Sequence, residues 1–213
     1  MMRAAIGLVL ALALQDRWEA DIRAFEAQDR AAPPAPGGVV FVGSSSIRLW
    51  NLREAFPDLP VLNRGFGGSQ MADAARYAER IVIPYKPRAV VVFAGGNDIN
   101  AGKSPEDVLA AFKDLVGKIH AALPETRIYF ISLFPNLKRA AQDPACRRVN
   151  ELIRAFAKTD SRLGFIDPRP RMENAEGKVR PELLREDGLH LNEEGYKIWN
   201  EAVGPVIRAA LAK

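Results

Sequence analysis

Four short segments of this sequence carry side chains of the types needed for acyl transfer by a serine. Such chemistry requires a serine on an exposed turn, an imidazole base within hydrogen-bond reach, a carboxylate that orients the base, and N–H donors for the oxyanion. Each of these groups occurs in one of the four segments. The segments are Phe41–Ile47, Asn63–Ser69, Ala94–Asp98 and Glu186–Leu191.

The first segment offers a nucleophile, because three consecutive serines follow an apolar run that ends at Gly43. A serine between a strand and a helical turn is well exposed, and its own backbone N–H can act as an oxyanion donor. Gly43 allows the chain to turn tightly at this point. The residues alone leave open which of Ser44, Ser45 and Ser46 would react.

The last segment offers a base and the group that orients it. Asp187 and His190 are three positions apart in a predicted loop, so the carboxylate can fix the tautomer of the imidazole. The two middle segments offer oxyanion donors, namely the unobstructed backbone N–H of Gly68 and the side-chain amide of Asn97. The other histidine of the chain, His120, lies in a predicted helix and is expected to be structural.

Each of these features has a simpler structural explanation when it is taken alone. A Gly-Ser-Ser-Ser turn often caps a helix, consecutive glycines often form a flexible turn, and Asn97 with Asp98 could cap a helix through their side chains. A single histidine in a loop is more often solvated than catalytic. The functional interpretation therefore depends on the four segments lying together on one rim of one sheet.

After residue 38, short apolar runs alternate with helical patterns, and this alternation predicts the strands and helices that position the four segments. One run, 90–93, is continuously apolar, as expected for a central parallel strand covered on both faces. One helix begins at Ser104 with Pro105 in its first position, and the last helix begins at Asn192 and is expected to kink or split at Pro205. Strands are predicted at 39–42, 61–62, 89–94, 127–133 and 164–167.

This alternation predicts an α/β fold, a three-layer α/β/α sandwich with a doubly wound, flavodoxin-like parallel sheet of about five strands. Ligands bind such sheets beyond the carboxyl ends of the strands, where the serine, glycine and asparagine segments fall.

Length and composition predict one soluble globular domain with a short leader: 213 residues, of which 48% are apolar and 26% charged. Residues 1–14 contain an apolar run and a small-residue cleavage pattern, and are interpreted as a signal peptide for periplasmic or extracellular export. The alternative is an N-terminal helix of a cytoplasmic protein. The run is too short for stable membrane insertion. Residues 15–38 are predicted to form an amphipathic helix and a proline-rich linker, and residues 39–213 the main domain.

Other classes of function find little support in the composition. The net charge is +4, but the basic residues are dispersed without a run of five, so nucleic-acid binding is not expected. The single cysteine, Cys146, cannot form an internal disulfide, and no Cys/His cluster has metal-ligand spacing. No metal or organic cofactor is therefore expected. The sequence gives no indication of oligomeric state.

The four segments, in this order, resemble the four blocks of the SGNH hydrolase superfamily, also called GDSL-type esterases and lipases. The resemblance covers the chain from about residue 39 to the C-terminus. Gly95–Asp98 and Asp187–Leu191 are close to the family pattern, and Phe41–Gly43 with Gly67–Gly68 is similar to platelet-activating-factor acetylhydrolase-like members. The resemblance implies a triad of Ser45, Asp187 and His190, and an oxyanion hole built from the N–H groups of Ser45 and Gly68 with the side chain of Asn97.

The sequence departs from the family pattern at one position. The first block of the family usually reads Gly-Asp-Ser, and here Ser44 takes the place of the aspartate. Keeping Gly43 in register selects Ser45 as the nucleophile, whereas a shift to Ser46 would put Ser44 in the place of the glycine. We expect the lost carboxylate to alter local hydrogen bonding without removing a member of the triad.

The resemblance implies a serine esterase, and the absence of a long insertion that could form a lid favours short acyl groups such as acetyl, on a small-molecule or glycan alcohol. Trp50, Phe134 and Tyr196 are candidates for lining the substrate cleft, and ordinary core or rim aromatics are the alternative. Two other functions stay open. One is a flavodoxin-like module that binds phosphate or a nucleotide at the serine turn, and the other is a silent hydrolase homologue that binds glycans.

Overall fold

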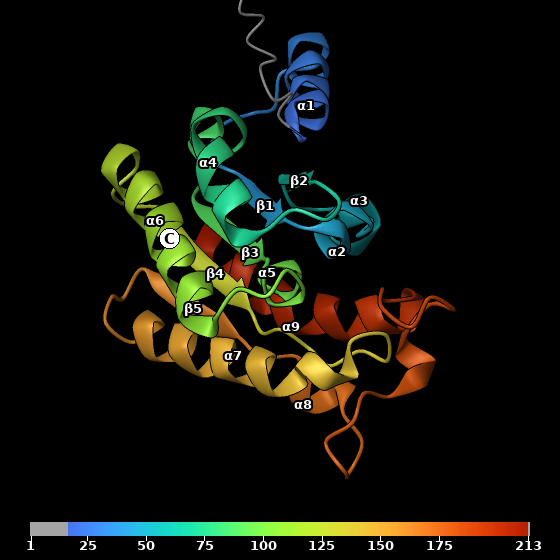
Figure 1. The fold of residues 1–213 in the computed structure, drawn as a ribbon. Coiled ribbons are helices and arrows are strands. Elements are labelled where there is room, and N and C mark those ends of the chain that lie inside the picture. The colour runs from blue at the N-terminus through green and yellow to red at the C-terminus, as the bar shows by residue number, and fades with distance from the viewer. Residues whose placement is uncertain (1–16, 213) are drawn as a thin grey trace, which may run out of the picture.

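The computed structural model of the protein describes residues 17–212. Its centre is a sheet of five parallel strands in the order β2-β1-β3-β4-β5. Helices cover both faces of this sheet, so the fold is the predicted three-layer α/β sandwich (Figure 1). The strands are β1 (Val39–Gly43), β2 (Val61–Gly65), β3 (Ala89–Phe93), β4 (Arg127–Ile131) and β5 (Leu163–Ile166).

The helices fall into two layers. Helices α4, α6 and α7 pack side by side over one face of the sheet, and α9 packs against β3 from the other (Figure 1). Short 3₁₀ turns occupy Ile83–Tyr85, Ala140–Gln142 and Pro181–Leu183. The helices are α1 (Glu19–Ala31), α2 (Ser45–Arg48), α3 (Leu52–Ala55), α4 (Met71–Ile81), α5 (Gly96–Asn100), α6 (Pro105–Ala122), α7 (Asp143–Ala157), α8 (Arg169–Met172) and α9 (Glu193–Leu211).

Strands β1 and β3 lie at the middle of the sheet, and every residue in both is buried. Their sequences are almost wholly apolar because helices cover them on both faces. The two strands pair in register from Val39 opposite Ala89 to Gly43 opposite Phe93. Both therefore end at the same height, which brings the loops that follow them to one rim.

Helix α6 begins where the sequence predicts, with Ser104 as the N-cap and Pro105 in the first turn. The Ser104 side chain accepts a hydrogen bond from the backbone N–H of Asp107, and the Asp107 carboxylate accepts one from the backbone N–H of Ser104. This reciprocal arrangement is a capping box and satisfies donors that the helix itself cannot. One stripe of apolar residues along this helix is buried in full: Val108, Phe112, Leu115, Val116 and Ile119.

Helix α9 differs from its prediction, because it runs unbroken from Glu193 to Leu211 through Pro205. The helix is therefore not split at Gly204-Pro205, and a kink there stays a prediction. Proline removes one hydrogen bond from a helix interior. Here the fully buried Trp199 and Val203 before it and Ile207 after it anchor both halves of the helix in the core.

The N-terminal helix α1 packs against α4 and lies at the edge of the molecule (Figure 1). Its Ile22 is fully buried, and Glu19 and Glu26 both form ion pairs with Arg80 of α4. The helical part of the predicted segment 15–38 is thus present from Glu19 onward. The predicted signal peptide, residues 1–14, lies outside the described residues, and export stays a prediction. Across residues 17–212, no helix is both long and apolar enough to cross a membrane.

Candidate active site

The serine turn is set at the rim of the sheet by the end of β1. Gly43 has φ +144°, and a Cβ atom built there would lie 2.0 Å from the carbonyl oxygen of Phe93. Only glycine therefore fits this position. The backbone N–H of Ser44 then donates to the same Phe93 carbonyl at 3.1 Å, and Ser45 becomes the first residue of α2.

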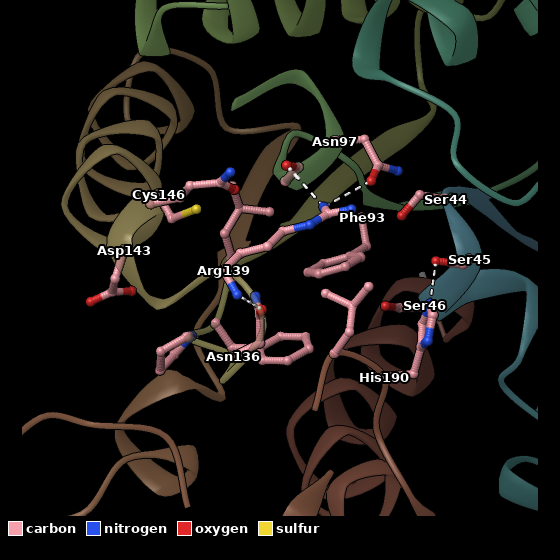
Figure 2. A pocket seen from close by; sticks show the side chains of 16 residues that line it. Ser44, Ser45, Ser46, Phe93, Asn97, Asn136, Arg139, Asp143, Cys146 and His190 are labelled. Carbon is pink, nitrogen blue, oxygen red and sulfur yellow. Dashed lines mark hydrogen bonds between the residues drawn. The ribbon is translucent and has the colours of Figure 1, made fainter. Parts of the chain in front are cut away.

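The side chain of Ser45 meets His190 across 145 positions of sequence. Ser45 Oγ lies 2.9 Å from His190 Nε2, and His190 Nδ1 lies 2.5 Å from Asp187 Oδ2. With Nδ1–H donated to the carboxylate, the neutral imidazole presents Nε2 as an acceptor for the serine hydroxyl. The three side chains thus form one continuous chain of hydrogen bonds from carboxylate to hydroxyl. Figure 2 shows the His190 ring directed at Ser45.

The Asp187 carboxylate is held by its own loop. Its Oδ1 accepts hydrogen bonds from the backbone N–H groups of Leu189 and His190, each at 2.9 Å. The backbone N–H of His190, joined by its imidazole, holds the pKa of the Asp187 carboxyl well below its usual range. Although 40% of the Asp187 side chain is exposed, the group is therefore an anion at neutral pH and fixes the orientation of the ring.

The three serines differ in their surroundings. Ser44 and Ser46 are buried at 7% and 6% exposure, although both touch the same pocket. Among the described residues, the imidazole of His190 is hydrogen-bonded to the hydroxyl of Ser45 and to no other serine. The geometry therefore brings Ser45, the serine selected by counting from Gly43, to the base.

Asn97 reaches the same pocket from the end of β3. Gly95 turns the chain at φ +124° and α5 begins directly after it, which places the Asn97 side chain beside the serine turn (Figure 2). Asn97 Nδ2 donates to the carbonyl of Ser69 at 3.0 Å, and Oδ1 accepts from Nη1 of Arg139 at 3.0 Å. Because an amide nitrogen carries two hydrogens, one donor remains for a ligand.

Gly68 is placed close to this arrangement but not in the lining of the pocket that Ser45, Asn97 and His190 share. It precedes Ser69, whose carbonyl is bonded by Asn97, and it adopts φ +77°. Its Cα faces the N-terminal segment, since a Cβ there would come within 3.3 Å of both Arg17 and Trp18. Its role as an oxyanion donor stays a prediction.

The aromatic candidates separate into two groups. Phe134 lines the pocket and stacks on Phe93 with ring centroids 5.7 Å apart. Trp50 and Tyr196 do not line it, and the expectation that they contact substrate is wrong. They are 3% and 8% exposed and belong to the core beneath the serine turn. The Tyr196 hydroxyl donates to the carbonyl of Ser46 at 2.8 Å, so this residue supports the turn from below.

The pocket encloses a cavity of about 50 Å³. One wall is the loop after β4, which contributes residues that lie outside the four sequence segments, among them Asn136 and Arg139. The signal that could have found them is their position at the carboxyl end of a parallel strand, where ligands bind in this fold. The full lining is Ser44, Ser45, Ser46, Phe93, Gly96, Asn97, Leu133, Phe134, Pro135, Asn136, Arg139, Gln142, Asp143, Cys146, Leu189 and His190.

Cys146 is a second group of nucleophilic type in the lining, but its environment makes it inert. Burial raises the pKa of its thiol to about 11, so the thiol is protonated at neutral pH. Within the part of the chain that the structure describes, no three His, Cys, Asp or Glu side chains gather as a metal site would require.

Comparison with known proteins agrees with this geometry. The model of the GDSL-like lipase/acylhydrolase family matches residues 46–198. The human protein named platelet-activating factor acetylhydrolase IB subunit alpha1 is 30% identical over 190 residues, which cover 84% of this chain and 78% of that protein. The chain therefore belongs to the GDSL-like lipase/acylhydrolase family, as the resemblance of its four segments implies, and it is a hydrolase of the acylhydrolase and esterase type.

Solved structures share the fold. A GDSL-like lipase from Bacteroides thetaiotaomicron superposes with a TM-score of 0.75 at 22% identity, covering 90% of this chain and 98% of that chain. An acetyl-xylooligosaccharide esterase from Geobacillus superposes with a TM-score of 0.64 at 17% identity, covering 82% of this chain and 95% of that chain. The three-layer sandwich with its parallel five-stranded sheet is thus the fold of known esterases.

Proposed function

We propose that the protein is a serine esterase that hydrolyses short-chain esters, acetyl esters in particular, through an acyl-enzyme. The observation that carries the proposal is the chain of hydrogen bonds from Asp187 through His190 to Ser45 at the rim of the sheet. A hydroxyl bonded to an oriented, neutral imidazole is the arrangement that makes serine a nucleophile at neutral pH.

The mechanism follows from the roles of these groups. His190 takes the proton of Ser45 as its Oγ attacks the acyl carbon, and then gives that proton to the departing alcohol. Water, activated by the same imidazole, next attacks the acyl-enzyme, which releases the acid and restores the serine. Asp187 keeps the ring oriented and stabilises the imidazolium in both steps.

The oxyanion of each tetrahedral intermediate needs donors that are already in place. We assign this role to the backbone N–H groups of Ser45 and Gly68 and to Nδ2 of Asn97. Support comes from Asn97, whose amide is held in one orientation by Ser69 and Arg139 and still has one N–H to offer.

The size of the pocket supports a small acyl group. A cavity of about 50 Å³ has room for only a few water-sized groups, and Phe93, Phe134 and Leu133 form its buried apolar side. Two proteins to which the chain is similar are named for acetyl esters, the platelet-activating factor acetylhydrolase subunit and the acetyl-xylooligosaccharide esterase. We extend this substrate class to the present chain, with a soluble or carbohydrate alcohol.

The test uses a fluorophosphonate probe, which labels activated serines, and hydrolysis of 4-nitrophenyl acetate. Wild-type protein should react with the probe and hydrolyse 4-nitrophenyl acetate, whereas Ser45→Ala and His190→Ala should do neither. Ser44→Ala and Ser46→Ala are matched controls, because they remove neighbouring hydroxyls that do not contact the imidazole. Labelling that survives Ser45→Ala but disappears with either neighbour would refute the assignment, and absence of labelling in every form would favour a silent homologue.

A further inference from the structure

The pocket beside Ser45 contains a cation without an anionic partner. Arg139, from the loop after β4, lines the pocket and is partly buried. Among residues 17–212, no carboxylate lies within ion-pair distance of its guanidinium, although ion pairs hold many of the other arginines, for example Arg80, Arg169 and Arg208. A charge that is partly removed from water needs a partner, so this isolation calls for an explanation.

The hydrogen bonds of the guanidinium show which part of it the protein uses. Nη1 donates to the carbonyl of Gly96 at 3.3 Å and to Oδ1 of Asn97 at 3.0 Å. These two bonds occupy both hydrogens of Nη1. The hydrogens on Nε and Nη2 have no acceptor among the described residues. The Nε–Nη2 edge of an arginine presents two parallel N–H groups, which is the geometry that binds a carboxylate or phosphate in a bidentate manner.

The other charged groups around the pocket do not neutralise this cation. Asp143 also lines the pocket, but its Oδ1 accepts from Arg169 at 2.6 Å and its Oδ2 from Arg147 at 2.9 Å. Asp187 is engaged by His190 and its own loop. Partial burial lowers the pKa of Arg139, but an arginine pKa is so high that the group stays charged at neutral pH. The field inside the pocket therefore favours an anion.

We propose that the Nε–Nη2 edge of Arg139 binds an oxyanion of the substrate, so that the preferred substrates are esters carrying a carboxylate, or another planar or tetrahedral oxyanion, close to the scissile bond. This inference rests on the proposed esterase function and specifies its substrate class. The guanidinium points toward Asn97 and lies across the pocket from the Ser45–His190 pair (Figure 2). A substrate that spans the pocket would thus be held at its charged end while its carbonyl meets the serine.

The anion could belong to the acyl part or to the alcohol part, and two matched pairs of esters distinguish the sources. The first pair is mono-4-nitrophenyl succinate and its neutral methyl ester, in which the charge lies on the acyl group. The second pair is 4-acetoxybenzoate and methyl 4-acetoxybenzoate, in which it lies on the leaving group. The quantity measured is the ratio of kcat/KM for the charged ester to that for the neutral ester.

In one of the two pairs, the wild-type ratio should exceed that of Arg139→Gln by roughly 10- to 100-fold, the contribution of charge-assisted hydrogen bonds. Arg139→Lys should keep part of the preference, because it retains the charge but lacks the fork. Because Arg139 also contacts Asn97, its variants are expected to lower kcat/KM for every ester. The ratio of kcat/KM values is not affected by a loss that is common to the charged and the neutral ester. Lys138→Gln is the matched control, because it removes an exposed neighbouring cation that does not line the pocket.

Equal ratios in wild type and Arg139→Gln for both pairs would overturn the inference. Hydrolysis that persists in Ser45→Ala would instead overturn the esterase mechanism. In that case a binding assay, which does not depend on hydrolysis, tests the anion site at Arg139. Calorimetry with succinate and with 4-hydroxybenzoate compares Ser45→Ala with the Ser45→Ala/Arg139→Gln double variant. Binding of either anion to the first protein and not to the second supports the anion site, and equal binding or none refutes it.

Discussion

Nη1 of Arg139 and the carbonyl of Ser69 hold the two ends of the same Asn97 amide, each at 3.0 Å. If the amide rotated by 180°, its NH₂ group would face the N–H of Arg139 and its oxygen would face the carbonyl of Ser69. Both contacts would be unfavourable, so the two hydrogen bonds fix the position of the amide nitrogen. The second hydrogen of Nδ2 is therefore presented without any reorganisation, which is the condition under which a donor stabilises an oxyanion well.

Asn97→Asp should lower kcat for 4-nitrophenyl acetate by roughly 10²–10³-fold, because it replaces the proposed oxyanion donor by an acceptor of the same shape. The new carboxylate would lie beside Arg139 and form an ion pair, so the fold should be retained. Steady-state kinetics and a circular dichroism spectrum check both statements. Asn100→Asp is the control at the exposed end of the same helix α5. Equal kcat values for the two variants would contradict the role of Asn97.

Asp187→Asn should reduce kcat by roughly 10⁴-fold, the size of loss found when a triad carboxylate becomes an amide. The amide oxygen can still accept the backbone N–H groups of Leu189 and His190, so the loop should keep its shape. The rate of fluorophosphonate labelling should fall together with kcat, because both depend on the base. A variant that labels at the wild-type rate would show that the carboxylate is not part of the mechanism.

The buried thiol of Cys146 makes stability depend on alkaline pH. Its pKa is raised from 9.0 to about 11 in the folded protein, so the folded state favours the neutral thiol. This contribution is fully present below pH 9 and is lost as pH rises through 11, by on the order of 1–3 kcal/mol. The free energy of unfolding in urea should therefore fall between pH 9 and 11, and less steeply for Cys146→Ala. Parallel curves for the two proteins would show that the thiol does not contribute.

Gly43→Ala should destabilise the fold by more than about 2 kcal/mol, because φ +144° and the contact with the Phe93 carbonyl both exclude a Cβ atom. Urea unfolding measures the change. Gly117→Ala in helix α6 is the control, since nothing lies within 4 Å of a Cβ built there. It should stabilise by roughly 0.5–1 kcal/mol, because alanine is the better helix former. A Gly43→Ala variant as stable as wild type would contradict the close approach of β1 to β3.

The fold could be predicted because its signals are local. The apolar run of β3 and the capped, striped helix α6 each specify one element, and short connections then leave few topologies for five parallel strands. The Ser45, Asn97 and His190 segments were identifiable for a related reason. Each follows a strand or occupies a loop beyond the sheet, so the topology itself brings them to one rim.

Side-chain direction was not predictable to the same degree. Tyr196 was a candidate for substrate contact, yet it belongs to the buried stripe of α9 that also contains Trp199 and Val203. The helical spacing of these three already indicated a core position. Arg139 was missed for a different reason, because it lies in an irregular loop whose backbone is held by the carbonyl of Gly188, from another part of the chain.

The residues at the start of helix α1 precede the sheet in the sequence, yet they reach the loop that carries Gly68. Trp18 packs edge-on against Phe66 with ring centroids 5.7 Å apart, and the chain at Arg17 and Trp18 lies directly over Gly68. A shortened protein that begins at the first strand would lack Arg17 and Trp18, which cover the loop that carries Gly68. It would still contain Ser45, Asp187 and His190. Such a shortened protein would be a misleading reference for the turnover of the whole chain.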